Sequence, residues 1–199
     1  MAKKSGKKIN QKNPDKKQTP ESPLNLKPLV FAALFAALLA AVAPFKIPLG
    51  FTPVPITLQT LVVLLSGAML GPYYGALSML LYITVGALGL PVFAGGGSGI
   101  GALLGPTGGY LFSYFIAAFA IGKILQLRKS PRAIDYVVAM FVGTLIIYVL
   151  GAAQGMLITG LGLSAILIGW VLPFIIGDFV KMLLAAYIAS RVDIKRYMR

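Results

Sequence analysis

Length, composition and charge place the chain in a narrow range of protein classes. It has 199 residues, of which 58% are hydrophobic and 12% charged, which indicates a polytopic membrane protein with no second globular domain. It contains no cysteine, no histidine and only five acids. This composition excludes disulfides and Ser/His/Asp or Cys/His catalysis, so we expect neither an enzyme nor a metal site.

The chain begins with a basic tail. Residues 1–23 are rich in lysine, contain proline and have almost no large apolar side chains, so we expect a disordered tail on the cytoplasmic side. Residues 24–199 are predicted to form one transmembrane domain. The net charge of +13 is compatible with nucleic-acid binding, but the basic residues gather in this tail and at predicted membrane edges. That distribution favours a role in orienting the protein, with no nucleic-acid partner.

Six apolar segments follow, and each is predicted to be a transmembrane helix in an all-α bundle. Gly71 and Pro72 separate the second segment from the third, and proline is well placed to start a helix. Pro173 predicts a kink in the last segment. The approximate ranges are 26–45, 56–70, 72–90, 107–125, 133–153 and 164–189.

The positions of the lysines and arginines predict the orientation of these helices. All but two of the 18 precede the first segment, flank the connection between the fourth and fifth, or follow the sixth. The exceptions are Lys46 and Lys181. With six crossings these three groups lie on one side, so the N- and C-termini are predicted to be cytoplasmic and the protein to be a multi-pass protein of the cell membrane.

A glycine-rich connection, residues 89–109, is predicted on the outer side. It is nearly uncharged and moderately apolar, which favours a loop that folds back over the helix ends as a lid, the alternative being a mobile glycine linker. It contains neither G-x-x-x-x-G-K-[ST] nor G-x-G-x-x-G, so we expect the chain to hydrolyse no nucleotide by itself.

Several side chains at the predicted outer ends are candidates for a binding site. Gln59 offers both a donor and an acceptor. Thr107 is predicted to cap the fourth helix, whose free N–H groups attract an anion such as a carboxylate, although capping alone explains a threonine there. Aromatic residues either line an apolar pocket or belong to the core or the interfacial belt: Tyr82, Phe93, Tyr110 and Trp170.

Asp178 and Lys181 are the strongest candidates for a site. They are the charged residues inside an apolar segment, where each charge costs about 2.5–3.5 kcal/mol. Because they are three residues apart on a helix, they share one face and can neutralise each other. The pair predicts a binding site within the membrane, and a purely structural ion pair is the alternative.

The first segment carries small residues four apart, which form a smooth face where another helix can approach closely. This face can pack inside the bundle or bind a partner. The residues are Ala32, Ala33, Ala36, Ala37, Ala40 and Ala41.

Four short strings give the chain a resemblance to the BioY family, the biotin-specific S components of energy-coupling factor (ECF) transporters. They are Phe-Thr-Pro-Val-Pro-Ile-Thr-Leu-Gln-Thr at 51–60, Gly-Leu-Pro-Val-Phe-Ala-Gly-Gly at 89–96, Leu-Gly-Pro-Thr-Gly-Gly-Tyr at 104–110 and Gly-Asp-x-x-Lys at 177–181. The resemblance covers about residues 26–189 and does not include the basic tail.

The resemblance implies a six-helix S-component fold that binds biotin at the outer face and needs no cofactor. It also implies a transmembrane coupling subunit and two ATPase subunits as partners, with ATP used only by those subunits. An Ala-x-x-x-Ala motif for docking to the coupling subunit corresponds best to Ala33 and Ala37, with the register of Ala32 and Ala36 as an alternative.

For biotin we expect Asp178 to accept from a ureido N–H and Lys181 to donate to the ureido carbonyl. The ligand carboxylate then lies near the glycine-rich loop and Thr107. The reverse pose, with the carboxylate on Lys181, is left open. We also expect contributions from Gln59 and from walls formed by Tyr82, Phe93 and Tyr110. Alternative functions are an S component for another vitamin and a proton-coupled secondary transporter.

Overall fold

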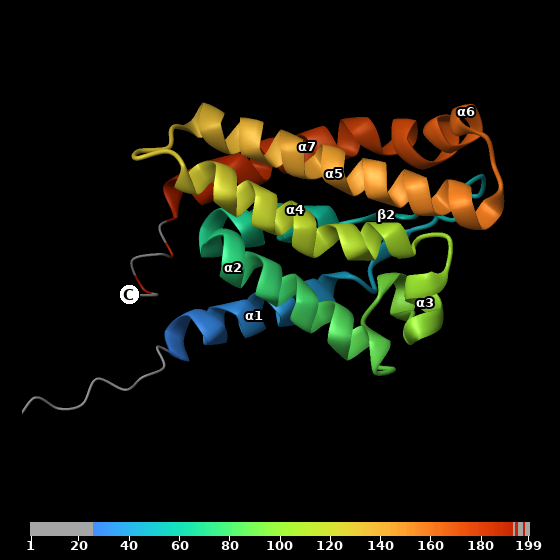
Figure 1. The fold of residues 1–199 in the computed structure, drawn as a ribbon, viewed down its shortest axis with the longest axis horizontal. Helices are drawn as coiled ribbons and strands as arrows, with labels where there is room; N and C mark the ends of the chain where they lie inside the picture. Colours follow the sequence, from blue (N-terminus) through green and yellow to red (C-terminus); the bar gives the residue numbers. More distant parts are fainter. Residues whose placement is uncertain (1–25, 193, 195–196, 198–199) are drawn as a thin grey trace, which may run out of the picture.

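The computed structural model describes residues 26–192, 194 and 197. The predicted basic tail, residues 1–23, lies outside the described residues. The described part is mostly helical, and its long helices run along a common direction (Figure 1). These helices are α1 (Leu26–Val42), α2 (Gln59–Ala87), α4 (Gly108–Gln126), α5 (Ala133–Thr159) and α7 (Leu172–Arg191).

Four helical stretches within the described residues are long and apolar enough to cross a membrane. Helix α1 is apolar but has only 17 residues. The second and third predicted segments both lie in α2, which counts here as one stretch. In the described part of the chain, length and composition therefore give four candidate spans, whereas six were predicted. The four stretches are Gln59–Ala87, Gly108–Gln126, Ala133–Thr159 and Leu163–Arg191.

The predicted break at Gly71 and Pro72 is confirmed, and it lets α2 fold back on itself. Gly71 has φ 80° and ψ −175°, a conformation that only glycine adopts readily. Beyond it, the Gln59 amide nitrogen lies 2.7 Å from the Tyr82 hydroxyl, although 23 residues of unbroken helix would separate them by roughly 34 Å. The two halves of α2 are therefore antiparallel neighbours.

Small residues hold the fold-back against α4. A Cβ added at Gly122 of α4 would collide with the backbone of Gly71 and Pro72. Between the halves of α2, the hydroxyls of Ser66 and Ser78 lie 2.7 Å apart, and the Gly75 carbonyl lies 3.1 Å from the first and 2.7 Å from the second. Each hydroxyl has one proton, so one serine donates to this carbonyl while the other donates either to the carbonyl or to the first hydroxyl. All three buried groups therefore have partners within the protein.

The last predicted segment is interrupted as expected from Pro173. A short helix α6 (Leu163–Ile166) leads into a π-helical turn, η2 (Leu167–Val171), and α7 begins directly after it. Val171 departs from helical geometry with φ −123°. Because Pro173 has no N–H, the preceding turn lacks one helical donor and widens there.

The glycine-rich connection is ordered by hydrogen bonds. It contains a 3₁₀ turn, η1 (Ala94–Gly96), and a short helix, α3 (Ile100–Leu104), which lies at the far end of the bundle from the α4–α5 connection (Figure 1). Gln154 of α5 donates from its side-chain nitrogen to the carbonyls of Leu103 and Gly105 at 2.8 and 2.7 Å. The segment therefore folds back over the helix ends, as the first of the two sequence interpretations expected.

A two-stranded antiparallel ribbon lies at the same end of the molecule. Strand β1 (Lys46–Ile47) pairs with β2 (Ile56–Thr57), and Lys46 lies opposite Thr57. Strand β2 leads directly into α2. The ribbon thus fixes the segment before α2 beside the loop that follows it.

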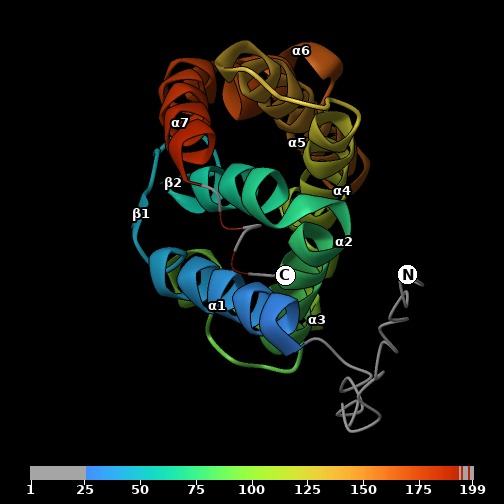
Figure 2. The same cartoon turned by 90° about the vertical axis from the view of Figure 1, so that its left-hand side faces the viewer.

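Helix α1 packs against α2 along one edge of the bundle (Figure 2). Ala32 is fully buried and Ala36 is partly buried in this contact. Ala33 and Ala37 are exposed on another face of α1. The two alternative alanine registers therefore have different surroundings, one inside the bundle and one on its surface.

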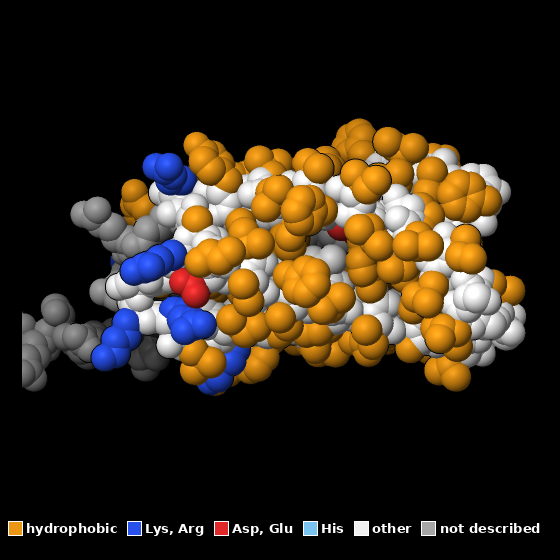
Figure 3. All heavy atoms as spheres, turned by 90° about the horizontal axis from the view of Figure 1, so that it is seen from above, with side chains coloured by type: hydrophobic (Ala, Val, Ile, Leu, Met, Phe, Trp, Pro, Cys, Tyr) orange, Lys and Arg blue, Asp and Glu red, His pale blue; other side chains and the backbone are white. Residues whose placement is uncertain are grey.

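The surface matches a bilayer environment. Large apolar side chains cover most of the face seen in Figure 3, whereas the lysines and arginines gather at one end. Many leucines, isoleucines and phenylalanines of α5 and α7 are exposed, and only 22% of the last apolar stretch is buried within the protein. An exposed apolar belt of this length is stable in lipid and costly in water, so the chain is a multi-pass membrane protein.

Candidate functional site

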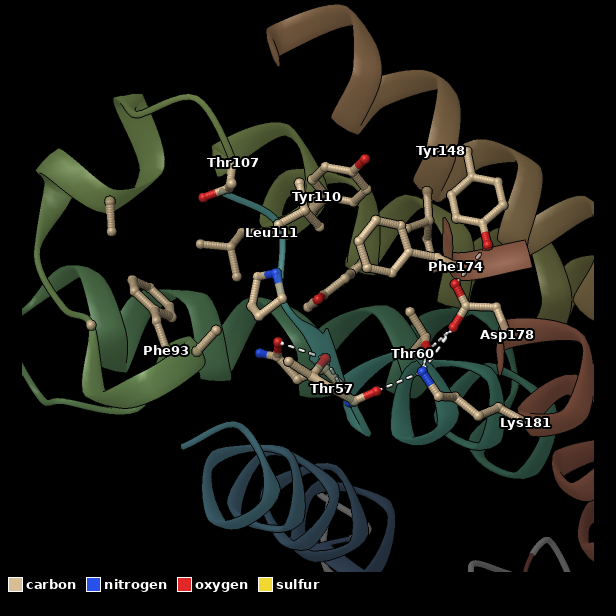
Figure 4. Close-up of a pocket in the computed structure, with 18 residues that line it drawn as sticks. Thr57, Thr60, Phe93, Thr107, Tyr110, Leu111, Tyr148, Phe174, Asp178 and Lys181 are labelled. Atoms are coloured by element: carbon tan, nitrogen blue, oxygen red, sulfur yellow. Dashed lines mark hydrogen bonds and ion pairs between the residues drawn. The ribbon is translucent and has the colours of Figure 1, made fainter. Parts of the chain in front are cut away.

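A cavity of about 150 Å³ lies between the ends of the helices near the glycine-rich loop. Its walls come from the β2–α2 junction, the loop, and the helices α4, α5 and α7. Seen in Figure 4, Phe93 and Thr107 lie at one end of the cavity, and Tyr148, Asp178 and Lys181 lie at the other. We call these the loop end and the charged end.

The charged end is built around the predicted pair. Lys181 Nζ lies 2.9 Å from Asp178 Oδ1, one turn of α7 apart. Asp178 is 5% exposed, and the Lys181 side chain is 14% exposed. A charge this deeply buried is tolerable only when it is paired and hydrogen-bonded, and both conditions hold here.

Every N–H of the Lys181 ammonium has an acceptor. Besides Asp178, the ammonium donates to the Thr57 carbonyl at 2.6 Å and to the Thr60 hydroxyl at 3.3 Å. An ammonium has three donors and no acceptor. The Lys181 side chain therefore ties α7 to the start of α2 and has no donor left over.

Asp178 is held from two further helices. Its Oδ1 accepts from the Thr60 hydroxyl at 2.9 Å, and its Oδ2 accepts from the Tyr148 hydroxyl at 2.7 Å (Figure 4). A carboxylate has about four acceptor positions, so one on Oδ2 stays available to a ligand. The charges of Asp178 and Lys181 cancel, so the charged end has no net charge. Its side chains are held by these bonds, and it can accept one more hydrogen bond.

The middle of the cavity is apolar and aromatic. Tyr110 turns its hydroxyl away from the space to donate to the Trp170 carbonyl at 2.7 Å, which leaves the ring as wall. Trp170 itself is 3% exposed and belongs to a small core cluster, not to the cavity or an interfacial belt. The other apolar walls include Leu111, Tyr114, Ile147 and Phe174.

Phe93 closes the loop end. Its ring fits against Gly86 of α2 so closely that a Cβ there would overlap the ring. It also contacts the Tyr82 ring edge-on, with centroids 5.5 Å apart. Phe93 therefore lines the cavity, and its role as a wall around the ligand stays a prediction.

The structure corrects the prediction for Tyr82. This side chain does not line the cavity, because the folded-back α2 turns it into the core, where it is 1% exposed. Its hydroxyl accepts from the Gln59 amide and donates to the Val92 carbonyl at 3.0 Å. Tyr82 therefore supports Gln59 and Phe93 from behind.

Gln59 and Thr107 both line the cavity, and their contribution to ligand binding stays a prediction. The Gln59 carbonyl oxygen accepts from the Thr57 hydroxyl at 3.2 Å, which fixes the orientation of the amide. Thr107 occupies the residue before α4, but its side chain makes no capping hydrogen bond. Thr107 is therefore the N-cap residue, as predicted, but without the expected capping bond: it has φ −96° and ψ 1°, unlike the extended backbone that usually lets a cap side chain reach the helix N–H groups.

Sequence reasoning missed two polar partners of the pair, Thr60 and Tyr148. Thr60 follows Gln59 at the end of the family string 51–60, and Tyr148 carries a hydroxyl in the middle of an apolar stretch. A polar group inside a span was the signal, the same signal that identified Asp178. Within the described residues, no three side chains of the kinds that hold a metal lie together.

Comparisons with known proteins agree with this architecture. A sequence model of the BioY family matches residues 14–197. The chain is 41% identical to the biotin transporter BioY of Thermotoga maritima over 167 residues, which cover 84% of this chain and 96% of that protein. It is 40% identical to the probable biotin transporter BioY of Pyrococcus horikoshii over 170 residues, which cover 85% and 98%.

A solved structure has the same fold. The S-component for biotin from an ECF-type ABC transporter superposes with a TM-score of 0.79 at 32% identity, covering 87% of this chain and 96% of that one. The match of fold, the match of sequence over most of both chains, and the family strings at the cavity all point the same way. The chain belongs to the BioY family.

Proposed function

We propose that the chain is the biotin-binding and biotin-uptake membrane subunit, the S component, of an ATP-driven ECF-type transporter, and not an enzyme. The observation that carries the proposal is the neutral Asp178–Lys181 pair at the end of an apolar cavity in a chain of the BioY family. Biotin has a neutral ureido ring at one end, an apolar body, and an aliphatic tail that ends in a carboxylate. The cavity offers a matching order of surfaces.

The ureido ring suits the charged end because both sides are neutral and polar. One ureido N–H can donate to the remaining acceptor position of Asp178 Oδ2. The ureido carbonyl can accept from Lys181 by replacing its bond to the Thr60 hydroxyl, at 3.3 Å the longest of the three. The fused rings and the tail then lie against Tyr110 and Phe174.

A carboxylate at Lys181 is the less favourable pose. It would add a second negative charge beside Asp178, within a buried site whose charges already balance. Like charges this close in a low-dielectric setting cost far more than in water. The balance of charge therefore favours the ureido ring at the charged end and the carboxylate at the loop end.

We propose six crossings with both termini on the cytoplasmic side. The fold-back at Gly71 supports two crossings within α2, and α1 and the α6–α7 stretch supply two more beside α4 and α5. The basic residues at one end of the molecule support that end as the cytoplasmic one (Figure 3). The cavity then lies near the outer face.

The proposed partners are a transmembrane coupling subunit and two ATPase subunits, with no cofactor on this chain. The absence of nucleotide-binding motifs from the sequence supports an energy source on other subunits. Exposure of Ala33 and Ala37 supports their register as the docking face, since Ala32 and Ala36 are already occupied by packing. Small exposed residues let a partner helix approach closely.

Titration of the purified chain with biotin, thiamine and riboflavin tests the ligand. We expect saturable binding of biotin alone. Binding of thiamine or riboflavin in place of biotin would identify an S component for another vitamin. Uptake that persists with inactive ATPase subunits and stops with an uncoupler would identify a proton-coupled carrier instead.

A further inference from the structure

The carboxylate of the ligand needs a cation that the charged end does not provide. All three donors of Lys181 are used, and its charge is balanced by Asp178. This step rests on the proposed function, because it concerns the tail of biotin. An anionic tail in a largely apolar cavity is stable only beside a positive group or several N–H donors.

Lys46 is a second lysine close to the cavity. In the β1–β2 ribbon it lies directly opposite Thr57, which lines the cavity. Residues opposite each other in an antiparallel pair have side chains on the same face, with Cβ atoms about 5 Å apart. Lys46 therefore extends from the same face of the ribbon as Thr57.

The end of the Lys46 side chain reaches the glycine-rich loop. A Cβ added at Gly95 would collide with Cε and Nζ of Lys46, so the ammonium group lies directly over that glycine. Ala94, just before this glycine, and Gly97, two residues after it, line the cavity beside Phe93. Lys46 does not itself line the cavity, but it places its charge over the loop segment that forms the wall at the loop end.

The Lys46 ammonium has no hydrogen-bond or ion-pair partner among residues 26–192, 194 and 197. In that part of the chain, the acids are Asp135, paired with Arg128 at 3.2 Å, and Asp178, paired with Lys181. Among the residues that the structure describes, Lys46 is the basic residue nearest the loop end. Lys181 lies at the charged end, and the other described lysines and arginines lie at the opposite end of the helices. The charge of Lys46 is uncompensated where the anionic tail is expected.

We propose that Lys46 is the carboxylate-binding residue of the cavity and makes the site selective for an anionic ligand tail over a neutral one. The ammonium donates to the carboxylate at the loop end, while Asp178 and Lys181 hold the ureido ring. The two lysines have separate tasks: Lys181 completes a neutral polar end, and Lys46 supplies the single net positive charge that matches a monoanion.

The test uses the full chain, purified in nanodiscs, with biotin and the neutral biotin carboxamide as ligands. The variants are Lys46→Met, which keeps an unbranched apolar chain over Gly95 without the charge, and Lys46→Arg, which keeps the charge. Lys123→Met, at the far end of α4, is the matched control. Thermal unfolding of each variant verifies that the fold is retained.

Because Lys46 is exposed, we expect Lys46→Met to weaken biotin binding about twofold to fivefold and to leave the carboxamide affinity unchanged, the size expected for an exposed ion pair. Lys46→Arg and Lys123→Met should keep the wild-type preference for biotin. High salt should reduce the wild-type preference, because the interaction is electrostatic.

Equal loss of both ligands in Lys46→Met would overturn the inference, since it would mean that the lysine holds the loop and not the carboxylate. Unchanged affinity for both ligands would overturn it as well. Failure of the wild-type chain to bind biotin at all is a different result, because it would contradict the proposed function before Lys46 is tested.

Discussion

The two ends of the cavity are built in different ways. At the charged end, side chains from α2, α5 and α7 bond to one another across the bundle. All three donors of Lys181 are used, and Asp178 keeps one acceptor position free on Oδ2. At the loop end, backbone groups and one glutamine hold a segment whose glycines take positive φ, including Gly95 and Gly99. The difference suggests that the charged end recognises a rigid neutral group and that the loop end adapts to close over the tail.

Of the variants that test this comparison, Asp178→Asn is expected to have the largest effect on stability and biotin affinity. It leaves the buried Lys181 charge without a counter-charge, which should destabilise the chain by about 3–5 kcal/mol. We also expect biotin affinity to fall at least about a hundredfold. The variant loses the charged acceptor for the ligand and the ion pair that positions Lys181. Thermal unfolding and equilibrium titration measure the two effects.

The double variant Asp178→Asn/Lys181→Met separates binding from folding. Removing both charges should recover much of the lost stability, because no uncompensated charge stays buried. Biotin binding should not recover. A double variant that binds biotin as the wild type does would mean that the pair is purely structural.

Tyr148→Phe is expected to have the next largest effect. It removes the 2.7 Å hydrogen bond to Asp178 Oδ2 and keeps the ring in the cavity wall. A bond to a charged group contributes about 1.5–3 kcal/mol, so biotin affinity should fall about tenfold or more in a titration. Tyr73→Phe, which removes an exposed hydroxyl away from the cavity, is the control and should bind normally. Normal binding by Tyr148→Phe would show that Asp178 needs no support from α5.

Gln154→Met tests the loop end. The change removes the two hydrogen bonds to Leu103 and Gly105 that tie the loop to α5, each contributing about 0.5–1.5 kcal/mol. We expect biotin to dissociate about five- to tenfold faster, with little change in association, in stopped-flow measurements. Gln126→Met at the opposite end of α4 is the matched control. Equal dissociation rates in both variants would contradict a closing role for the loop.

Ala37→Leu should have the smallest effect on ligand binding, since Ala37 lies on the exposed face of α1 and away from both ends of the cavity. Affinity for biotin should stay within about twofold, because surface changes of this kind cost less than 0.5 kcal/mol. Uptake by the assembled transporter should nevertheless fall, because the larger side chain blocks close helix approach. The control is Ala165→Leu, an exposed alanine of α6. Normal uptake in Ala37→Leu would contradict the proposal that this face of α1 is the docking site.

The local parts of this molecule could be predicted from the sequence. Spacing alone put Asp178 and Lys181 on one helix face, and the Gly71–Pro72 step correctly predicted a break. Both are decided within a few residues by helix geometry and backbone sterics. The four short strings likewise indicated the family, because each string is contiguous in the chain and can be read without the fold.

The parts that depend on distant packing could not be predicted. Thr60 lies 118 residues before its partner Asp178, and no local pattern reports that contact. The error for Tyr82 has the same origin. Whether its side chain faces the cavity or the core depends on how tightly α2 folds back at Gly71. The residue type of Thr107 correctly predicted its N-cap position, but the missing capping bond depends on its backbone angles, φ −96° and ψ 1°, which the residue type does not determine.

A crystal structure of the chain with biotin bound tests the central claim most directly. We expect the ureido ring at the charged end, with an N–H within hydrogen-bonding distance of Asp178 and the carbonyl near Lys181. We expect the carboxylate at the loop end beside Lys46. A carboxylate seated on Lys181, with the ureido ring at the loop, would contradict the account.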